Sequence, residues 1–108
     1  MIAVIFELWP DEGRADDYFA LAASLKPRLE QIDGFISVER FASVSEEGKF
    51  VSISFWRDEE AVRHWRNDAE HREAQNAGRG GIFRNYRLRV ASVLRDYGLA
   101  ERSGAPKN

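Results

Sequence analysis

Aromatic and titratable side chains gather in one short stretch of this chain. The apolar segment 50–57 is followed directly by the charged segment 58–79, whose composition favours a helix. That segment holds Trp65 and both histidines of the protein, His64 and His71. An imidazole titrates near neutral pH and can move protons, and an indole can stack on a flat ligand. We therefore expect any acid–base chemistry of this protein to be organised here.

Helical geometry leaves two interpretations open for each of these side chains. Trp65 lies centrally on the apolar side of the predicted helix, which favours packing in the core over contact with a substrate. His71 lies about 120° around the helix from Trp65, where an acid or base at a pocket rim and a solvated surface residue fit equally well. His64 and His71 are about 10.5 Å apart along the axis, which is too far for two ligands of one zinc ion.

Further candidates lie on other segments. Glu7 is flanked by apolar residues of the first predicted strand. If it points inward, burial raises its pKa and makes it a base; the pattern favours the alternative, an ordinary outward-facing strand residue. The side chains that could bind a substrate and stabilise a developing oxyanion are Asn67, Arg79, Arg84, Asn85, Tyr86, Arg87 and Arg89. Exposure at a strand edge accounts for most of these arginines equally well.

Hydrophobic periodicity predicts the elements that must position these residues. In chain order they are a strand, a helix, two strands, a helix and a strand, over residues 2–9, 14–32, 35–41, 49–56, 58–75 and 82–97. Pro27 interrupts the first helical pattern, so we expect a kink there or two consecutive short helices. The 108 residues suffice for one domain, which we place at 1–97, followed by a C-terminal tail at 98–108.

The order β-α-β-β-α-β predicts an α+β protein with a ferredoxin-like fold, in which both helices cover one face of an antiparallel sheet. The other face is then bare. Read literally, the alternation places Ile5, Trp9, Phe50 and Trp56, or their alternates, on one side, which is more aromatic surface than a soluble monomer usually exposes. We expect a second copy of the chain to cover that face, or the face to line a ligand cavity to which Trp56 contributes, or both.

Composition excludes several classes of function. The 16 basic and 18 acidic residues are spread along the chain without a basic stripe, which argues against a nucleic-acid partner. The absence of cysteine excludes disulfides and thiolate metal sites and suits a reducing cytoplasm. No apolar run approaches the roughly 20 residues of a membrane span, and the N-terminus lacks the basic start of a signal peptide. We therefore expect a soluble cytoplasmic protein with no membrane partner.

The chain resembles the antibiotic biosynthesis monooxygenase (ABM) family in the segments GFISVERFAS and EEGKFVSISFWRDEEAV, in a tryptophan within the second helix and a histidine shortly after it, and in a long last strand. The resemblance covers roughly residues 1–97 and is most specific at 50–79. It implies a dimeric α+β barrel. Family members include cofactor-free oxygenases of polyketide phenols and haem-degrading enzymes, and the resemblance implies that Trp65 lines the pocket.

Cofactor-free chemistry fits these residues best. An electron-rich phenol can be deprotonated to an anion that itself reduces oxygen, so the protein need only supply a base, a dry cavity and groups that hold the anion. No G-x-G-x-x-G motif follows a predicted strand, so no dinucleotide cofactor is indicated. The chain departs from the polyketide oxygenases at Ala61 and His71, where they commonly have asparagine and tyrosine. It departs from the haem degraders at Glu7 and Gln75, where they have asparagine and the haem-ligating histidine.

Three hypotheses follow. We predict a cofactor-independent monooxygenase that acts on a small aromatic, phenol- or quinol-like compound in a closed apolar cavity containing Glu7, Trp65 and His71. The alternative is a haem-binding and haem-degrading protein, with one of the two histidines pointing into a wider pocket. The third is a non-catalytic ligand-binding or stress-response domain, with both histidines in solvent and the cavity filled by the protein's own aromatic side chains.

Overall fold

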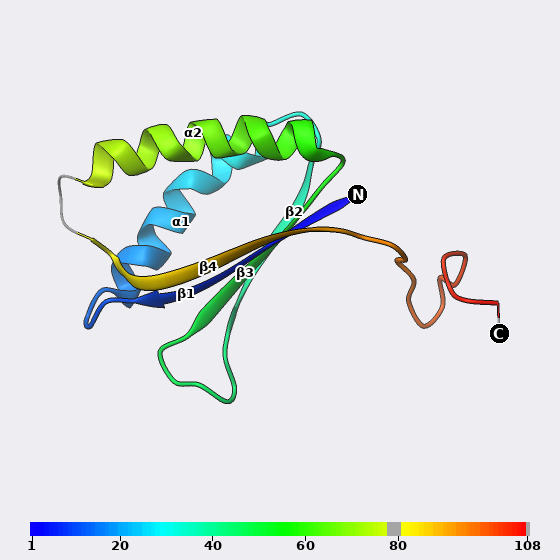
Figure 1. Cartoon of the computed structure of the whole chain (residues 1–108), viewed down its shortest axis with the longest axis horizontal. Coiled ribbons are helices and arrows are strands. Elements are labelled where there is room, and N and C mark those ends of the chain that lie inside the picture. Colours follow the sequence, from blue (N-terminus) through cyan, green and yellow to red (C-terminus); the bar gives the residue numbers. More distant parts are fainter. Residues whose placement is uncertain (78–80, 108) are drawn as a thin grey trace.

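The structure is a computed structural model, and it describes residues 1–77 and 81–107, apart from the side chains of residues 70–77. The elements in chain order are β1 (Ile2–Pro10), α1 (Ala15–Glu30), β2 (Phe35–Ala42), β3 (Phe50–Trp56), α2 (Glu59–Ala77) and β4 (Phe83–Ser92). Figure 1 shows both helices on one side of a twisted sheet, with the other side bare. The predicted α+β, ferredoxin-like βαββαβ fold is confirmed.

The sheet has the strand order β2-β3-β1-β4, and every neighbouring pair is antiparallel. Because side chains alternate along a strand, the register divides the sheet into two faces. The helix face carries Ile2, Val4, Phe6 and Leu8 of β1 and the residues paired with them. What we call the open face consists of Ala3, Ile5, Glu7 and Trp9 on β1, Val51, Ile53 and Phe55 on β3, Ser37, Glu39 and Phe41 on β2, and Asn85, Arg87, Arg89 and Ala91 on β4.

The core lies between the helix face and the two helices. Leu8 packs with two buried residues of α1, and Trp56 packs with Leu29 of α1 and Ala61 of α2. Leu8 and Trp56 are the two large side chains with no exposed surface among the described residues. Trp56 lies opposite Ile2 in the β1–β3 register, so it faces the helices. The grouping of Trp56 with Ile5 and Trp9 on one side of the sheet is therefore wrong.

Two predicted boundaries differ from the structure. α1 is one helix with Pro27 inside it, so the expectation of two short helices is wrong. Proline removes one backbone donor, and the carbonyl that loses it belongs to Ala23, an exposed residue that water can reach. β4 ends at Ser92 instead of near residue 97, since Ser92 pairs with Ile2, the first residue of β1, and the backbone N–H of Val93 then donates to the carbonyl of Met1 at 3.0 Å. Neither helix, in the part of the chain that is described, has an apolar stretch long enough to cross a bilayer.

Gly34 brings the turn before β2 close to α2. Its φ of +94° is in the left-handed region, and a Cβ at this position would lie 2.7 Å from the Cβ of Ala61. The carbonyl of Gly34 also accepts a hydrogen bond of 2.7 Å from the backbone N–H of Arg57, which precedes the helix. Glycine is thus required here both for backbone conformation and for space.

We expect Gly34→Ala to lower the free energy of unfolding by about 2–5 kcal/mol, since the left-handed penalty and overpacking against Ala61 add together. Gly48→Ala is the matched control, because Gly48 has a φ of +82° and nothing within 4 Å of the added methyl group. That control should lose only the backbone term, about 1–2 kcal/mol. Urea denaturation measures both variants, and equal losses would contradict the packing role of Gly34.

Candidate functional site

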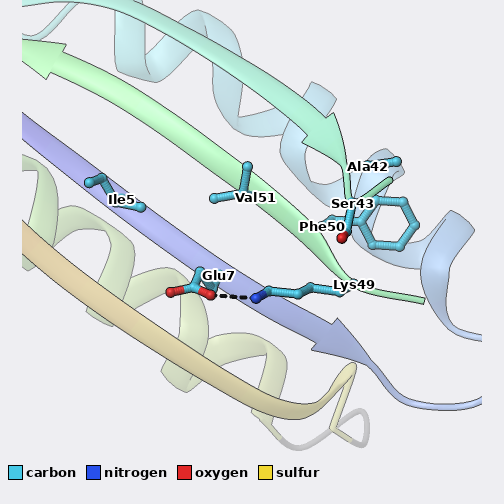
Figure 2. A pocket seen from close by; sticks show the side chains of 7 residues that line it. All are labelled: Ile5, Glu7, Ala42, Ser43, Lys49, Phe50 and Val51. Atoms are coloured by element: carbon cyan, nitrogen blue, oxygen red, sulfur yellow. Dashed lines mark ion pairs between the residues drawn. The ribbon is translucent and has the colours of Figure 1, made fainter. Parts of the chain in front are cut away.

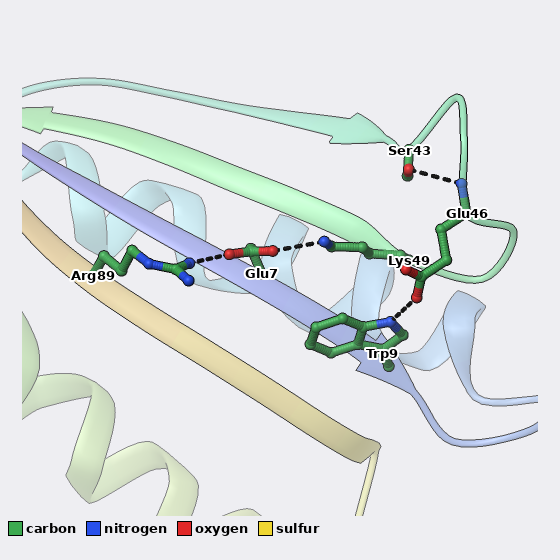
Figure 3. A network of polar contacts seen from close by, with 6 residues as sticks. All are labelled: Glu7, Trp9, Ser43, Glu46, Lys49 and Arg89. Carbon is green, nitrogen blue, oxygen red and sulfur yellow. Dashed lines mark hydrogen bonds and ion pairs between the residues drawn. The ribbon is translucent and has the colours of Figure 1, made fainter.

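The centre of the open face holds a network of charges. The carboxylate of Glu7 forms ion pairs with Lys49, at 2.6 Å, and with Arg89 (Figure 3). Hydrogen bonds from Lys49 and then from Arg89 lower the pKa of Glu7 and outweigh the opposing effect of burial. The interpretation of Glu7 as an inward-facing base with a raised pKa is therefore wrong, because its side chain lies on the open face and its ion pairs hold its pKa below the ordinary value.

The same network ties the β2–β3 loop to β1. The indole N–H of Trp9 donates to Glu46, and the ammonium of Lys49 lies 5.0 Å from the centre of the Trp9 ring (Figure 3). The backbone N–H of Glu46 donates in turn to Ser43 Oγ at 3.0 Å. The contacts of Trp9 join residues far apart in the chain, so no local pattern in the sequence indicates them.

Two hollows lie along the open face. One has a volume of about 270 Å³ and lies beside the ion pair of Glu7 and Lys49, as Figure 2 shows. Its lining residues are Ile5, Glu7, Ala42, Ser43, Lys49, Phe50 and Val51. The other, of about 360 Å³, is lined by Met1, Ile36, Ser37, Phe55, Val93, Arg95 and Asp96. Both have largely apolar walls.

Trp65 lies on the opposite side of the sheet from Glu7. It is half-buried on α2 and packs against the cluster of Leu29, Trp56 and Ala61. The predicted cavity containing both Glu7 and Trp65 is therefore wrong, since the sheet itself separates the two side chains. Part of the Trp65 ring still faces outward, so packing and contact with a ligand are compatible at this position.

The start of α2, which carries Trp65, is held by a side-chain cap. Asp58 Oδ1 accepts a hydrogen bond of 3.0 Å from the backbone N–H of Ala61, one of the helix-start donors without an intrahelical partner. This hydrogen bond, followed by one from Arg57, lowers the pKa of Asp58. The cap fixes where α2 begins, and so which residues of α2 meet the sheet.

The helix face of β4 is apolar but largely uncovered. Tyr86, Leu88 and Val90 point to the helix side, yet they are 58, 51 and 48 % exposed. The buried clusters beneath the helices centre on Leu8 of β1 and Trp56 of β3, so these three side chains on β4, at the edge of the sheet, are covered less. We call these three residues the β4 row. Among the described strands, β4 thus has the longest series of exposed apolar side chains at alternate positions on one face.

An aromatic cluster supports one end of the β4 row. The ring centre of Tyr86 lies 5.6 Å from that of Phe6 and 6.3 Å from that of Phe83, and the rings of Phe6 and Phe83 meet edge to face at 5.7 Å. Such pairs are favourable beyond the area they bury. Sequence reasoning named Tyr86 but missed Phe6 and Phe83. The alternation that places Phe6 on the same face as Leu8 could have indicated the first of them.

The remaining predicted site residues are scattered. Asn67 is exposed on α2, and Arg87 lies on the open face, on the opposite side of β4 from Tyr86. The backbone of His71 belongs to α2, but its side chain lies outside the described residues, as does the whole of Arg79. Trp56 has no exposed surface and its indole N–H donates to Ser54 Oγ at 2.9 Å. We therefore correct its predicted substrate-binding role to a core role.

Other titratable groups on α2 serve contacts between the helices. Asp68 accepts a hydrogen bond of 3.0 Å from Arg28 Nε of α1, and that interaction raises the pKa of Arg28. His64 is exposed to solvent. Among the residues that the structure describes, no three histidine, aspartate or glutamate side chains lie close enough together to hold a metal ion.

Comparison with known proteins identifies the family. The model of the antibiotic biosynthesis monooxygenase family matches residues 1–77. The chain belongs to this family. It is 47 % identical over 93 residues to the jasmonate monooxygenase ABM of Pyricularia oryzae, an alignment that covers 86 % of this chain and 43 % of that protein. The chain thus spans less than half the length of this relative.

Solved structures share the fold of this ABM protein. MhuD, a haem degrader of Mycobacterium tuberculosis with two haems bound, matches with a TM-score of 0.70 at 20 % identity, over 91 % of this chain and 100 % of that one. A mutant of SnoaB, a cofactor-independent oxygenase of Streptomyces nogalater, matches with a TM-score of 0.69 at 13 % identity, over 88 % and 94 % of the two chains. At these identities the likeness extends to the fold alone.

The ion pairs of Glu7 generate a pH-dependent prediction. Because its pKa is lowered below the ordinary 4.5, Glu7 stabilises the fold above that pH, and this contribution is lost as pH falls through the lowered pKa. We expect Glu7→Gln to be less stable than the parent at neutral pH, with the difference shrinking as the pH falls below the ordinary pKa of 4.5. Urea denaturation at neutral pH and at a series of acidic pH values measures it, with Glu47→Gln in the exposed loop as control. A difference independent of pH would contradict the assignment.

Proposed function

We propose that this ABM protein is a monooxygenase that oxygenates a small aromatic, phenol- or quinol-like compound without a bound flavin or metal, and that it acts as a homodimer joined through the open face. Family membership and similarity to a named monooxygenase support the reaction class. The observation that supports the proposed location of the substrate site is the β4 row, a half-exposed apolar surface on the helix side of the sheet.

The substrate would lie against the β4 row. Tyr86 is held by its contacts with Phe6 and Phe83 and still has more than half of its surface exposed, so a flat ligand ring can stack on it without displacing the core. Trp65 on α2 belongs to the same side of the sheet and would supply a second aromatic wall. Glu7 and Arg87 take no part in this site, because they lie across the sheet from it.

The proposed reaction needs only oxygen as the oxidant. A base removes the acidic proton of the substrate, and the resulting anion passes one electron to O₂. The two radicals combine into a C–O bond, and the peroxide loses water to leave a carbonyl. Converting a ring C–H of the phenol into a quinone carbonyl releases four electrons in all, which reduce one oxygen atom into the product and the other into water. We propose His71 as the base, since the protein need supply only a proton acceptor and a dry surface.

Jasmonate is a second candidate substrate, favoured by the 47 % identity to a jasmonate monooxygenase. Hydroxylation of a saturated carbon supplies only two of the four electrons that O₂ requires. Such a reaction would therefore depend on an added two-electron donor, whereas oxidation of an acidic phenol or quinol would not. The dependence on a reductant distinguishes the two substrate classes.

Haem degradation remains the alternative for this fold. Of the two histidines, the side chain of His64 alone is described, and it is exposed to solvent. That placement does not supply an axial ligand beneath the helices, so we derive no step through haem. Hemin nevertheless belongs in the assay, as the compound that tests this alternative directly.

The homodimer is supported by the composition of the open face. Ile5, Val51, Ile53 and Phe55 form its centre, each only partly buried in the single chain. A soluble protein rarely leaves such a patch in water, and a self-complementary contact between two copies would cover it. Covering this face would also enclose both of its hollows.

The reaction class is tested by oxygen uptake and absorbance with hydroxyanthrones, quinols, jasmonate and hemin, each with and without a reductant. Uptake with a phenolic compound alone supports the proposal. Oxygen uptake with jasmonate that requires a reductant would indicate jasmonate, and not a phenolic compound, as the substrate. A Soret shift followed by reductant-dependent bleaching would replace the reaction with haem degradation, and silence with all four would favour a non-catalytic domain.

The role of His71 is tested by comparing the two histidines of α2. We expect His71→Gln to lower kcat at least about 100-fold, because positioned proton transfer typically contributes that much. His64→Gln removes the same chemical group from an exposed position of the same helix and should leave kcat unchanged. Equal kcat values for the two variants would contradict the role of His71 as the base.

The substrate surface is tested on the β4 row. We expect Tyr86→Ala to lower kcat/KM about tenfold or more, since an aromatic contact with the substrate is lost. Tyr97→Ala is the matched control, because Tyr97 is also exposed, at 43 %, but lies beyond the end of β4. Loss of activity in both variants, or in neither, would contradict the proposed site.

A further inference from the structure

One partly buried arginine on the helix face has no acidic partner. Of the arginines whose side chains are described, Arg14 and Arg40 are the two that are partly buried, and Arg14 is paired with Asp17. Arg40 Nε donates a hydrogen bond of 3.3 Å to the hydroxyl of Tyr18 on α1, and within the described part of the chain its guanidinium has no ion pair. A guanidinium removed from water is normally paired with a carboxylate. The remaining N–H groups of Arg40 can therefore bind an anion.

Arg40 belongs to a row of side chains that the helices cover incompletely. The register aligns four residues of the helix face, one from each strand, which we call the middle row: Arg40, Ser52, Phe6 and Leu88. None of these four is buried, although Ser52 and Phe6 are on the two central strands. The rows on either side of it each contain a buried residue on a central strand, Leu8 in one and Ser54 in the other.

The middle row also lies between the two buried clusters of the described core. One cluster contains Leu8 and Tyr18, and the other contains Leu29 and Trp56. Along the strands, Leu8 and Trp56 lie on opposite sides of the middle row. A ligand that enters along this row would therefore lie between the clusters, and it would not have to displace either of them.

The polarity of the middle row differs between its two ends. Leu88 at the β4 edge belongs to the β4 row, and Phe6 continues the apolar surface onto β1. Arg40 at the β2 edge is the only charged side chain in the middle row and in the two rows beside it. Three strand spacings, about 14 Å, separate the backbones at the two ends. This surface fits an elongated ligand with an apolar ring at one end and a negative charge at the other.

We propose that the substrate is an elongated aromatic carboxylic acid, whose ring lies on the β4 row and whose carboxylate is bound by Arg40. A guanidinium presents two parallel N–H groups that match the two oxygens of a carboxylate. Because the hydroxyl of Tyr18 holds Arg40 Nε, it fixes the orientation of the guanidinium plane. The inference rests on the substrate surface proposed above and adds the acid group to the substrate class, while the reaction class does not depend on it.

A matched pair of ligands tests the role of Arg40. Naphthylacetate and naphthylacetamide have the same ring, but only the first carries a negative charge. The parent should bind the acetate about tenfold or more tightly than the amide, because hydrogen bonds to a charged group are the stronger ones. Arg40→Gln should abolish that preference and leave the affinity for the amide unchanged. Equilibrium dialysis measures the four dissociation constants.

Three further variants separate binding from structural effects. Arg63→Gln removes the same charge from an exposed position of α2 and should keep the full preference. Arg40→Lys keeps the charge without the planar pair of donors and should restore the preference in part. Tyr86→Ala should weaken the binding of both ligands equally, because it removes a contact with the ring. The ratio of the two affinities compares two ligands of one protein sample, so partial loss of folded protein leaves it unchanged.

The outcomes distinguish this inference from the proposed reaction. Equal binding of the two ligands by the parent, binding of neither, or a preference that survives in Arg40→Gln would each overturn the acid-binding role. Oxygen uptake with an uncharged phenol, at the same rate in the parent and in Arg40→Gln, would also overturn it and would leave the reaction class standing. A preference that depends on Arg40, together with no effect of Tyr86→Ala on either ligand, would overturn the placement of the ring on the β4 row.

Discussion

The structure depends on the antiparallel pairing of β1 with β3 on one side and with β4 on the other. β1 pairs with a strand on each side. Its alternation of side chains between the two faces therefore determines, through the register, on which face every side chain of the sheet lies. Leu8 and Phe6 face the helices, and Glu7, which lies between them, must face the opposite side. A base at Glu7 and an aromatic wall at Trp65 are therefore incompatible with a single cavity in one chain.

The helix face is covered unevenly by the two helices. The helix face is buried where α1 and α2 pack, and Trp56 and Leu8 lose all contact with solvent there. Because the two buried clusters centre on Leu8 of β1 and Trp56 of β3, the β4 row at the edge of the sheet is left partly exposed next to an aromatic cluster. Such a surface is apolar, preformed and incompletely covered, which are the properties expected of a site for a small flat ligand.

The open face combines apolar strips with charges in a fixed order. The carboxylate of Glu7 is paired with Lys49 and Arg89 at the centre of this face, so covering the face would leave no unpaired charge on Glu7. Among the described residues, the side chains of Glu39 and Arg87 have no ion pair at the two edges of this face. Their separation across four strands is a property of strand order, and no pattern along the chain contains it. Ferredoxin-like topology thus determines which residues lie on each face of the single sheet.

The sequence by itself determined the elements, their order and the fold class, because hydrophobic periodicity is local and strong over 2–9, 50–56 and 59–69. It also determined that Trp65 packs on the apolar side of α2, since helical spacing alone implies that position. Only the tertiary structure decided the orientation of Glu7, the burial of Trp56 and the end of β4 at Ser92. These follow from strand register and from which neighbours a strand has, and both are set by contacts between residues far apart in the chain.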